Sequence, residues 1–191
     1  MNMDYINKKL QEMLSEHRYQ HSLGTAIEAK KLAERYHSDQ DKAYLAGLLH
    51  DCAKSLSKEQ MKELLNDEGY SEEFLSCKTV MHAPAGEKLA EREFEITDAD
   101  ILHSIRYHCY GKEDMSLLEK IIYVADKIEP SRQYNGIDEL RKLAYENLDK
   151  ALLVFISHSI KTLTEQNRYL YENTIRAKKY YDDMVENKGK L

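Results

Sequence analysis

The sequence predicts an all-α protein, a single-domain helical bundle, on three observations. Apolar residues recur at three- and four-residue steps along most of the chain, which is the period of an amphipathic helix. Only seven glycines and two prolines occur in 191 residues, so few positions force a helix to end. No segment alternates apolar and polar residues over the length of a strand. We expect one domain over residues 1–191, with a core at about 15–130 and C-terminal helices at about 137–186 packed on it.

Three helices are predicted in the first third of the chain. The first is amphipathic, with charged residues between its apolar positions. The second is short and mostly apolar, from Ala43 to Ala53, and we expect it to be buried on most sides. Ser57 and Gln60 have the form of a capping box that opens the third, and Gly69 is predicted to end it. The apolar positions of the first helix are Leu23, Ala26, Ile27, Ala33 and Tyr36.

Five further helices follow. We place Pro84 near the start of a helix that runs to about Phe94, where the missing N–H costs little. Thr97 or Asp98 caps the segment through His108. A strongly apolar helix is then stopped by Pro130. That helix contains Leu118, Ile121, Ile122, Ala125 and Ile128; the next contains Leu148, Leu152, Phe155, Ile156 and Leu163; the last runs from about Asn173 to Val185.

The bulk properties indicate a soluble, cytoplasmic protein. The formal net charge of −6 argues against a nucleic-acid partner, because phosphate backbones are bound by basic surfaces. Cys52, Cys77 and Cys109 are widely spaced and odd in number, so we interpret them as reduced thiols. No apolar stretch approaches the ~20 residues that span a bilayer, and the first residues lack a signal-peptide pattern. We expect no membrane partner, and the sequence leaves a homodimer open.

An adjacent His50–Asp51 pair lies within an apolar run and carries the main chemical signal. Burying both side chains is costly unless something compensates them. A divalent cation does so, because imidazole nitrogen and carboxylate oxygen are both good ligands for Fe, Mn, Co or Zn. Alone the pair is weak evidence, since a solvent-facing His-Asp at a helix end has the same sequence.

Two other segments strengthen this interpretation. His21 opens the first amphipathic helix, and Asp126 lies in the apolar helix before Pro130, where a lone carboxylate would destabilise the fold. Together with His50 and Asp51, they give the order His, His-Asp, Asp along the chain. We therefore predict a metal site built from His21, His50, Asp51 and Asp126.

This pattern resembles that of the HD-domain metal-dependent phosphohydrolases. Further segments look like one bacterial branch of that family, the YqeK-type symmetrical bis(5′-nucleosyl)-tetraphosphatases, and the resemblance spans roughly residues 15 to 180. Tyr171-Glu172 departs from the branch, which has a His-Pro-type turn at this point. The segments that carry the resemblance are Arg18–Thr25, His50–Lys54, His82–Gly86, His108 and Ala125–Arg132.

The resemblance implies an HD-type fold and symmetrical hydrolysis of diadenosine tetraphosphate and related dinucleotides to two nucleoside diphosphates. It suggests iron as the metal, with Mn, Co, Ni or Zn able to substitute, as one or two ions. His82 and His108 either bind a second metal or contact the phosphate chain. The implied catalytic residues are Asp51, Lys54, His82 and His108, and the implied substrate contacts are Arg18, Lys54, His82, His108, Arg132, Tyr169 and Thr174.

Physical reasoning bears on several of these residues. Lys54 shares a predicted helical face with His50 and Asp51, where its ammonium would stabilise phosphate charge; a solvated lysine at a helix end is the alternative. Arg18 and Arg132 suit bidentate phosphate binding, or equally surface ion pairs. Tyr134 or Tyr169 could stack on a base, and we expect His37, His103 and His158 to be structural or exposed.

Three other functions are compatible with the sequence. The nearest is another HD-type nucleotide phosphohydrolase, either a nucleotidase or a phosphodiesterase. The second is a two-iron oxygenase, which requires His82 and His108 as metal ligands. The third is a non-enzymatic helical module that binds nucleotide or metal. Product analysis on a dinucleotide panel identifies another phosphohydrolase, and oxygen consumption identifies an oxygenase. Substrate that stays unchanged after long incubation identifies a binding module.

Overall fold

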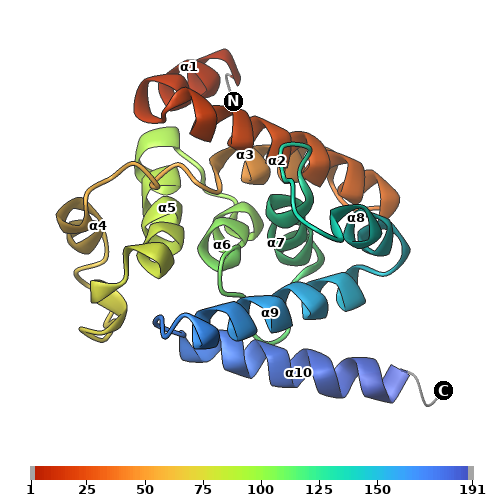
Figure 1. Ribbon diagram of the computed structural model, residues 1–191. Coiled ribbons are helices and arrows are strands. Elements are labelled where there is room, and N and C mark those ends of the chain that lie inside the picture. Colours follow the sequence, from red (N-terminus) through yellow and green to blue (C-terminus); the bar gives the residue numbers. More distant parts are fainter. Residues whose placement is uncertain (1–2, 189–191) are drawn as a thin grey trace.

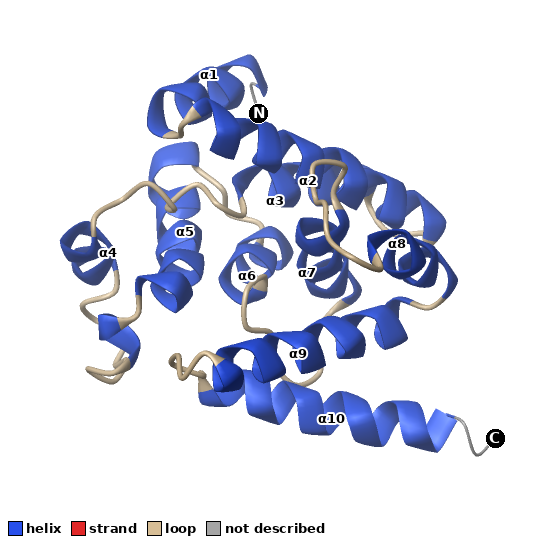
Figure 2. Cartoon of the chain, in the orientation of Figure 1, coloured by secondary structure: helices blue, strands red, loops and turns tan. Residues whose placement is uncertain are grey.

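The structure, a computed structural model, describes residues 3–188 (Figure 1). These residues form helices and no strand, which confirms the predicted all-α fold class (Figure 2). The helices are α1 (Met3–Met13), α2 (Glu16–Arg35), α3 (Gln40–Leu49), α4 (Lys58–Leu64), α5 (Lys78–Phe94), α6 (Ala99–Tyr107), α7 (Leu117–Ile128), α8 (Ile137–Glu146), α9 (Leu148–Glu165) and α10 (Glu172–Lys188), with a 3₁₀ turn, η1 (Phe74–Ser76), before α5.

Five helices form the body that holds the site. Helix α2 packs along α3 and against α7, while α6 packs against α3, α5 and α7. Helix α9 packs on α7 and α8, and α10 lies beside α9 along one edge of the molecule (Figure 1). Segments far apart in the sequence therefore meet between α2, α5 and α7. The predicted division into a core and packed C-terminal helices within one domain stays a prediction.

Helix α7 lies at the centre of this body. Ile121, Ile122 and Val124 are fully buried. With Tyr123 and Ala125 they form an unbroken buried apolar run that is longer than one helical turn, so it covers every side of the helix. Ser116 and Glu119 form a capping box at its N-terminus, which fixes where the helix begins. Asp126 is buried in its last turns, so its carboxylate needs charged or polar partners.

Several predicted helix ends are confirmed. The capping box of Ser57 and Gln60 is present at the start of α4. Asp98, rather than Thr97, caps α6 by accepting hydrogen bonds from two backbone N–H groups. Helix α7 ends at Ile128, just before Pro130. In each case a local hydrogen bond or a missing donor decides the boundary, which is why the sequence reveals it.

Three other boundary predictions were wrong. The helix predicted to reach Ala53 ends at Leu49, because the following residues form tight turns in which the Cys52 N–H donates to the Leu49 carbonyl at 3.0 Å. Helix α4 ends at Leu64, before the predicted stop at Gly69.

Pro84 lies well inside α5 rather than near its start, since the helix begins at Lys78. Its ring therefore removes the hydrogen bond that an N–H would donate to the Val80 carbonyl.

The described residues also bear on the bulk properties. No helix within residues 3–188 has both the length and the apolar character needed to cross a bilayer. Cys52, Cys77 and Cys109 are all free thiols.

Candidate metal centre

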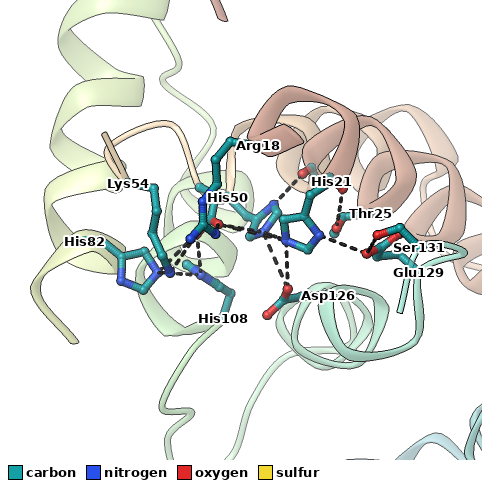
Figure 3. Close-up of polar contacts among 12 residues, drawn as sticks. Arg18, His21, Thr25, His50, Lys54, His82, His108, Asp126, Glu129 and Ser131 are labelled. Atoms are coloured by element: carbon teal, nitrogen blue, oxygen red, sulfur yellow. Dashed lines mark hydrogen bonds and ion pairs between the residues drawn. The ribbon is translucent and has the colours of Figure 1, made fainter. Parts of the chain in front are cut away.

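Six ionisable side chains from five separate segments converge in the interior (Figure 3). His21 comes from α2, His82 from α5 and Asp126 from α7. The other three lie at helix ends, where the chain turns: His50 and Asp51 directly after α3, and His108 directly after α6. All six are at most 6% exposed. Burial of so many polar groups in one place requires a compensating partner.

Two overlapping triads could each hold a metal ion. One consists of His21, His50 and Asp126, and the other of His50, Asp51 and His108; within each triad the candidate ligand atoms all lie within 4.8 Å of one another. His50 belongs to both. Asp51 Oδ2 lies 3.8 Å from His50 Nε2 and 3.9 Å from His21 Nε2, which links the triads. The four side chains predicted as ligands are therefore gathered, and their role as ligands stays a prediction.

The tautomers of His50 and His108 are set by backbone partners behind the rings. The Nδ1–H of His50 donates to the Gly47 carbonyl at 2.7 Å, and that of His108 donates to the Ile105 carbonyl at 2.7 Å. Because a carbonyl only accepts, Nδ1 carries the proton in both rings. In the neutral imidazoles Nε2 then has a free lone pair that points into the centre.

The contacts between these nitrogens test whether a metal fits. His50 Nε2 lies 3.2 Å from His21 Nε2, and His82 Nε2 lies 3.1 Å from His108 Nε2. Lone pairs that face each other at such distances repel unless a cation or proton lies between them. Asp51 Oδ1 is buried and accepts no hydrogen bond. Nitrogen and carboxylate donors with uncommitted lone pairs are the ligand set of a divalent transition metal, so the residues fit such an ion.

The protonation states agree with this ligand set. Burial lowers the pKa of His50 to about 3, and burial also lowers the pKa of His82 and His108. Burial would raise the pKa of Asp51 and Asp126, but neighbouring histidines for Asp51, and chiefly Lys127 for Asp126, hold both pKa values well below the usual range. His50, His82 and His108 are therefore neutral imidazoles beside ionised carboxylates, the forms that ligate metals.

His21 is supported by a carboxylate that the sequence analysis missed. Its Nδ1 donates to Glu129 Oε1 at 3.0 Å, and Glu129 is only 1% exposed. Ser131 fixes Glu129 from the other side through its backbone N–H and its hydroxyl. A Cβ at Gly24 would lie 2.7 Å from Glu129 Oε2, so this glycine leaves room for the carboxylate. Although burial opposes it, the hydrogen bonds to Asp126 and Glu129 raise the pKa of His21.

Two cations contact Asp51. Arg18 Nη1 donates to Asp51 Oδ2 at 3.3 Å, and Lys54 Nζ lies 3.3 Å from Oδ1. Lys54 also lies 2.9 Å from His82 Nε2. Lys54 was predicted to share a helical face with His50 and Asp51, which is wrong because α3 ends at Leu49. The turn after α3 nevertheless returns the ammonium to the same carboxylate.

Two further cations contact Asp126. Arg132 Nη2 donates to Asp126 Oδ1 at 2.7 Å, and Lys127 forms a short ion pair with Oδ2. The sequence analysis assigned no role to Lys127. Burial would lower the pKa of Lys127, but Asp126 raises it above its usual value. The centre is thus flanked by positive charge on both carboxylates.

A cleft of about 400 Å³ opens onto this centre, and we call it the central cleft. Its floor includes Asp51 and Asp126, whereas His21 and His50 do not line it. His158, expected to be structural or exposed, also lines it. All seven residues predicted as substrate contacts line the cleft: Arg18, Lys54, His82, His108, Arg132, Tyr169 and Thr174.

Comparison with known proteins identifies the family of the chain. Residues 18–131 match the family described as HD domain. A Bacillus subtilis protein named symmetrical bis(5′-nucleosyl)-tetraphosphatase is 41% identical over 91% of this chain and 94% of its own length. A Staphylococcus aureus protein of the same name is 35% identical over 95% of both chains.

A solved structure gives the same fold. The crystal structure of a predicted HD superfamily hydrolase involved in NAD metabolism, from Clostridium acetobutylicum, superposes with a TM-score of 0.93. It is 44% identical in sequence, and the match covers 96% of this chain and 98% of that one.

Proposed function

The chain belongs to the HD-domain family, and from that premise we propose that it is a symmetrical bis(5′-nucleosyl)-tetraphosphatase that cleaves diadenosine tetraphosphate and related dinucleotides into two nucleoside diphosphates. The observation that carries the proposal is the buried set of imidazole and carboxylate donors at a cleft, with four cations in contact with the two carboxylates. The relatives of that name cover nearly the whole chain, so the proposal concerns the whole protein rather than a part of it.

His21, His50, Asp51 and Asp126 are the proposed metal ligands, and His108 completes the second triad should two ions bind. A divalent cation bound there would neutralise charge on a phosphate oxygen and lower the pKa of a water molecule. Mixed imidazole and carboxylate donors disfavour Mg²⁺, which prefers oxygen ligands and retained water. We propose iron, with Mn, Co, Ni or Zn as substitutes.

The four cations around the carboxylates are proposed to bind the phosphate chain. Arg18 and Lys54 approach from the Asp51 side, and Lys127 and Arg132 from the Asp126 side. Phosphate oxygens can share these donors with the carboxylates, because a guanidinium has five N–H groups and an ammonium three. Held at several points, the two middle phosphates are oriented for in-line attack, and their developing charge is stabilised.

Asp51 and His82 are proposed to handle water and protons. Asp51 stays ionised, and its Oδ1 has Lys54 Nζ at 3.3 Å and His82 Nε2 at 3.2 Å but no hydrogen bond of good geometry, so it can accept one from the attacking water and orient it. The water oxygen bonds to one middle phosphorus, the bridging P–O bond breaks, and each half leaves as a nucleoside diphosphate. His82 Nε2 lies next to Lys54 and His108, and in the tautomer that carries its proton on Nε2 it would donate a hydrogen bond to a phosphate oxygen.

The remaining expectations are part of the same proposal. The free thiols of Cys52, Cys77 and Cys109 support a reducing, cytoplasmic location. The net charge of −6 supports a small nucleotide substrate rather than nucleic acid, because phosphate backbones are bound by extended basic surfaces.

Chromatography of the products from diadenosine tetraphosphate tests the proposal. With metal supplied, we expect two ADP molecules for each substrate consumed, also under strict anaerobic conditions. AMP with ATP in equal amounts would contradict symmetrical cleavage, and dependence on oxygen would point to an oxygenase. Intact dinucleotide after long incubation of metal-loaded protein would contradict the enzymatic proposal altogether.

A further inference from the structure

The central cleft continues into a second cavity on the side of α8 and α9, which we call the lateral cavity. Its volume of about 350 Å³ lies within the range of small-molecule sites. It shares lining residues with the central cleft, so the two spaces adjoin. The shared residues are Lys127, Arg132, His158 and Ser159, and the others are Tyr134, Asn135, Leu140, Val154 and Phe155.

The wall of the lateral cavity is apolar and open to solvent. Tyr134 and Val154 are 42% and 40% exposed, although both are large hydrophobic residues, and Phe155 is buried in the same wall. The Tyr134 hydroxyl donates to the Lys127 carbonyl at 2.9 Å, which anchors the ring. An anchored and exposed aromatic ring beside aliphatic surface is suited to stacking on a nucleobase.

Two cationic side chains lie where the lateral cavity meets the central cleft. Lys127 and Arg132 line both spaces, and both pair with Asp126 of the metal centre. A phosphate chain that passed from the metal centre into the lateral cavity would therefore run beside an ammonium and a guanidinium. The cavity is suited to a ligand with an apolar ring at one end and phosphate at the other.

A different cavity adjoins the central cleft near η1 and the start of α10. It has a volume of about 950 Å³, and Tyr169 lies in the wall that it shares with the cleft. It has no lining residue in common with the lateral cavity. The central cleft thus leads to two separate spaces, each with tyrosine in its wall.

The proposed substrate carries a nucleoside at each end of four phosphates and is cut in the middle. When its middle phosphates lie at the metal centre, its two nucleosides must extend in different directions. We propose that the lateral cavity binds the second nucleoside, with Tyr134 stacked on its base and Val154 against it, while the first lies toward Tyr169 and Thr174. This inference rests on the proposed function and adds the subsite that makes the enzyme selective for dinucleotides.

Replacing Tyr134 tests the subsite. Tyr134→Ala should raise the KM for diadenosine tetraphosphate about tenfold, because it removes the stacking on one base. The inhibition constant of ADP, which occupies the Tyr169 side, should change less than about twofold. Tyr134→Phe keeps the ring and should stay close to the wild type. Tyr5→Ala, an exposed tyrosine on α1 outside the cleft, is the matched control and should change neither constant.

A second variant tests the same subsite independently, in case Tyr134→Ala does not fold. Val154→Glu places a carboxylate at an exposed position of α9 and should also raise the KM for the dinucleotide without changing the ADP constant. An unchanged KM in both variants would overturn the inference, and so would an equal rise in both constants. Failure of the wild type to release ADP from diadenosine tetraphosphate would instead overturn the proposed function itself, and this inference with it.

Discussion

A histidine binds a metal through the ring nitrogen that carries a lone pair, and the partner of its other nitrogen decides which one that is. Backbone carbonyls perform this role for His50 and His108, whereas the Glu129 carboxylate does so for His21. A carboxylate partner makes an imidazole more basic, and hence a stronger ligand. Glu129 is therefore a positioning residue for the metal centre, although it lies behind His21 and does not line the cleft.

Glu129→Gln should weaken metal binding about 10- to 100-fold, because the neutral amide supports His21 less well and cannot accept from Ser131 with both oxygens. Metal affinity measured by chelator competition checks this. Glu139→Gln, on the exposed side of α8, is the matched control and should keep full affinity. Equal affinities in the two variants would show that Glu129 only supports the fold.

Lys54→Ala should leave the metal content unchanged and lower kcat on the order of 10²- to 10³-fold, as expected for loss of one donor to developing charge. Its ammonium contacts Asp51 and His82 without belonging to either metal triad. Metal analysis and steady-state kinetics on one preparation measure both effects. Lys161→Ala, exposed on α9, serves as control. Loss of metal from the Lys54 variant would reassign the residue to the structure of the centre.

Sequence reasoning could identify the predicted ligands because His50, Asp51 and Asp126 interrupt apolar runs and His21 completes their order along the chain. Burial of the Asp126 carboxylate within a helix costs free energy unless a charged group pairs with it. Glu129 and Lys127 gave no such signal: a charged residue near the end of a helix, just before a proline, is usually solvated. Only the path of the chain after α7, which returns Glu129 to α2, reveals their partners.

At the scale of elements, the close approach of α3 to α2 brings His50 near His21. Gly47 makes that approach possible, since a Cβ there would lie 2.8 Å from the Ala26 Cα. Gly47→Ala should therefore destabilise the protein by about 1–3 kcal/mol, even though alanine favours helix. Denaturant unfolding measures the change, and the metal affinity should fall with it.

Gly86 offers the comparison for this prediction. It too lies in a helix, but a Cβ there would first meet the Ile105 side chain, at 3.2 Å, rather than a backbone atom at 2.8 Å. Gly86→Ala should cost clearly less stability than Gly47→Ala. Equal stability losses would mean that the contact between α2 and α3 is not the constraint on the site.

Helix boundaries that are set by a local cap or by a proline could be read from the sequence more reliably than the others. Ser57, Asp98 and Pro130 act through local hydrogen bonds or a missing donor, so their effects are local too. The end of α3 at Leu49 depends on the tertiary contacts of the turn that follows it. Amphipathic patterns were also imperfect guides to burial, since Ile27 on α2 is 42% exposed.

At the scale of the whole molecule, an acidic chain presents a cationic site. The net charge is −6, yet four cations of the cleft contact the carboxylates of Asp51 and Asp126, and Arg132 also pairs with Glu129. A metal ion adds positive charge at the same point, so a highly anionic substrate meets a local field opposite to the net charge. Net charge alone argues against a nucleic-acid partner, but it could not locate this positive field. The cations are Arg18, Lys54, Lys127 and Arg132.

The central claim is that side chains from three distant stretches of chain hold one metal centre, with His50 shared by both triads. The metal-to-protein ratio of His50→Ala, compared with the wild type and with His158→Ala, tests it most directly. We predict at least about one ion per chain in the wild type and in the cleft-wall variant, and almost none in His50→Ala. A His50→Ala protein that retained the full wild-type metal content would contradict the account.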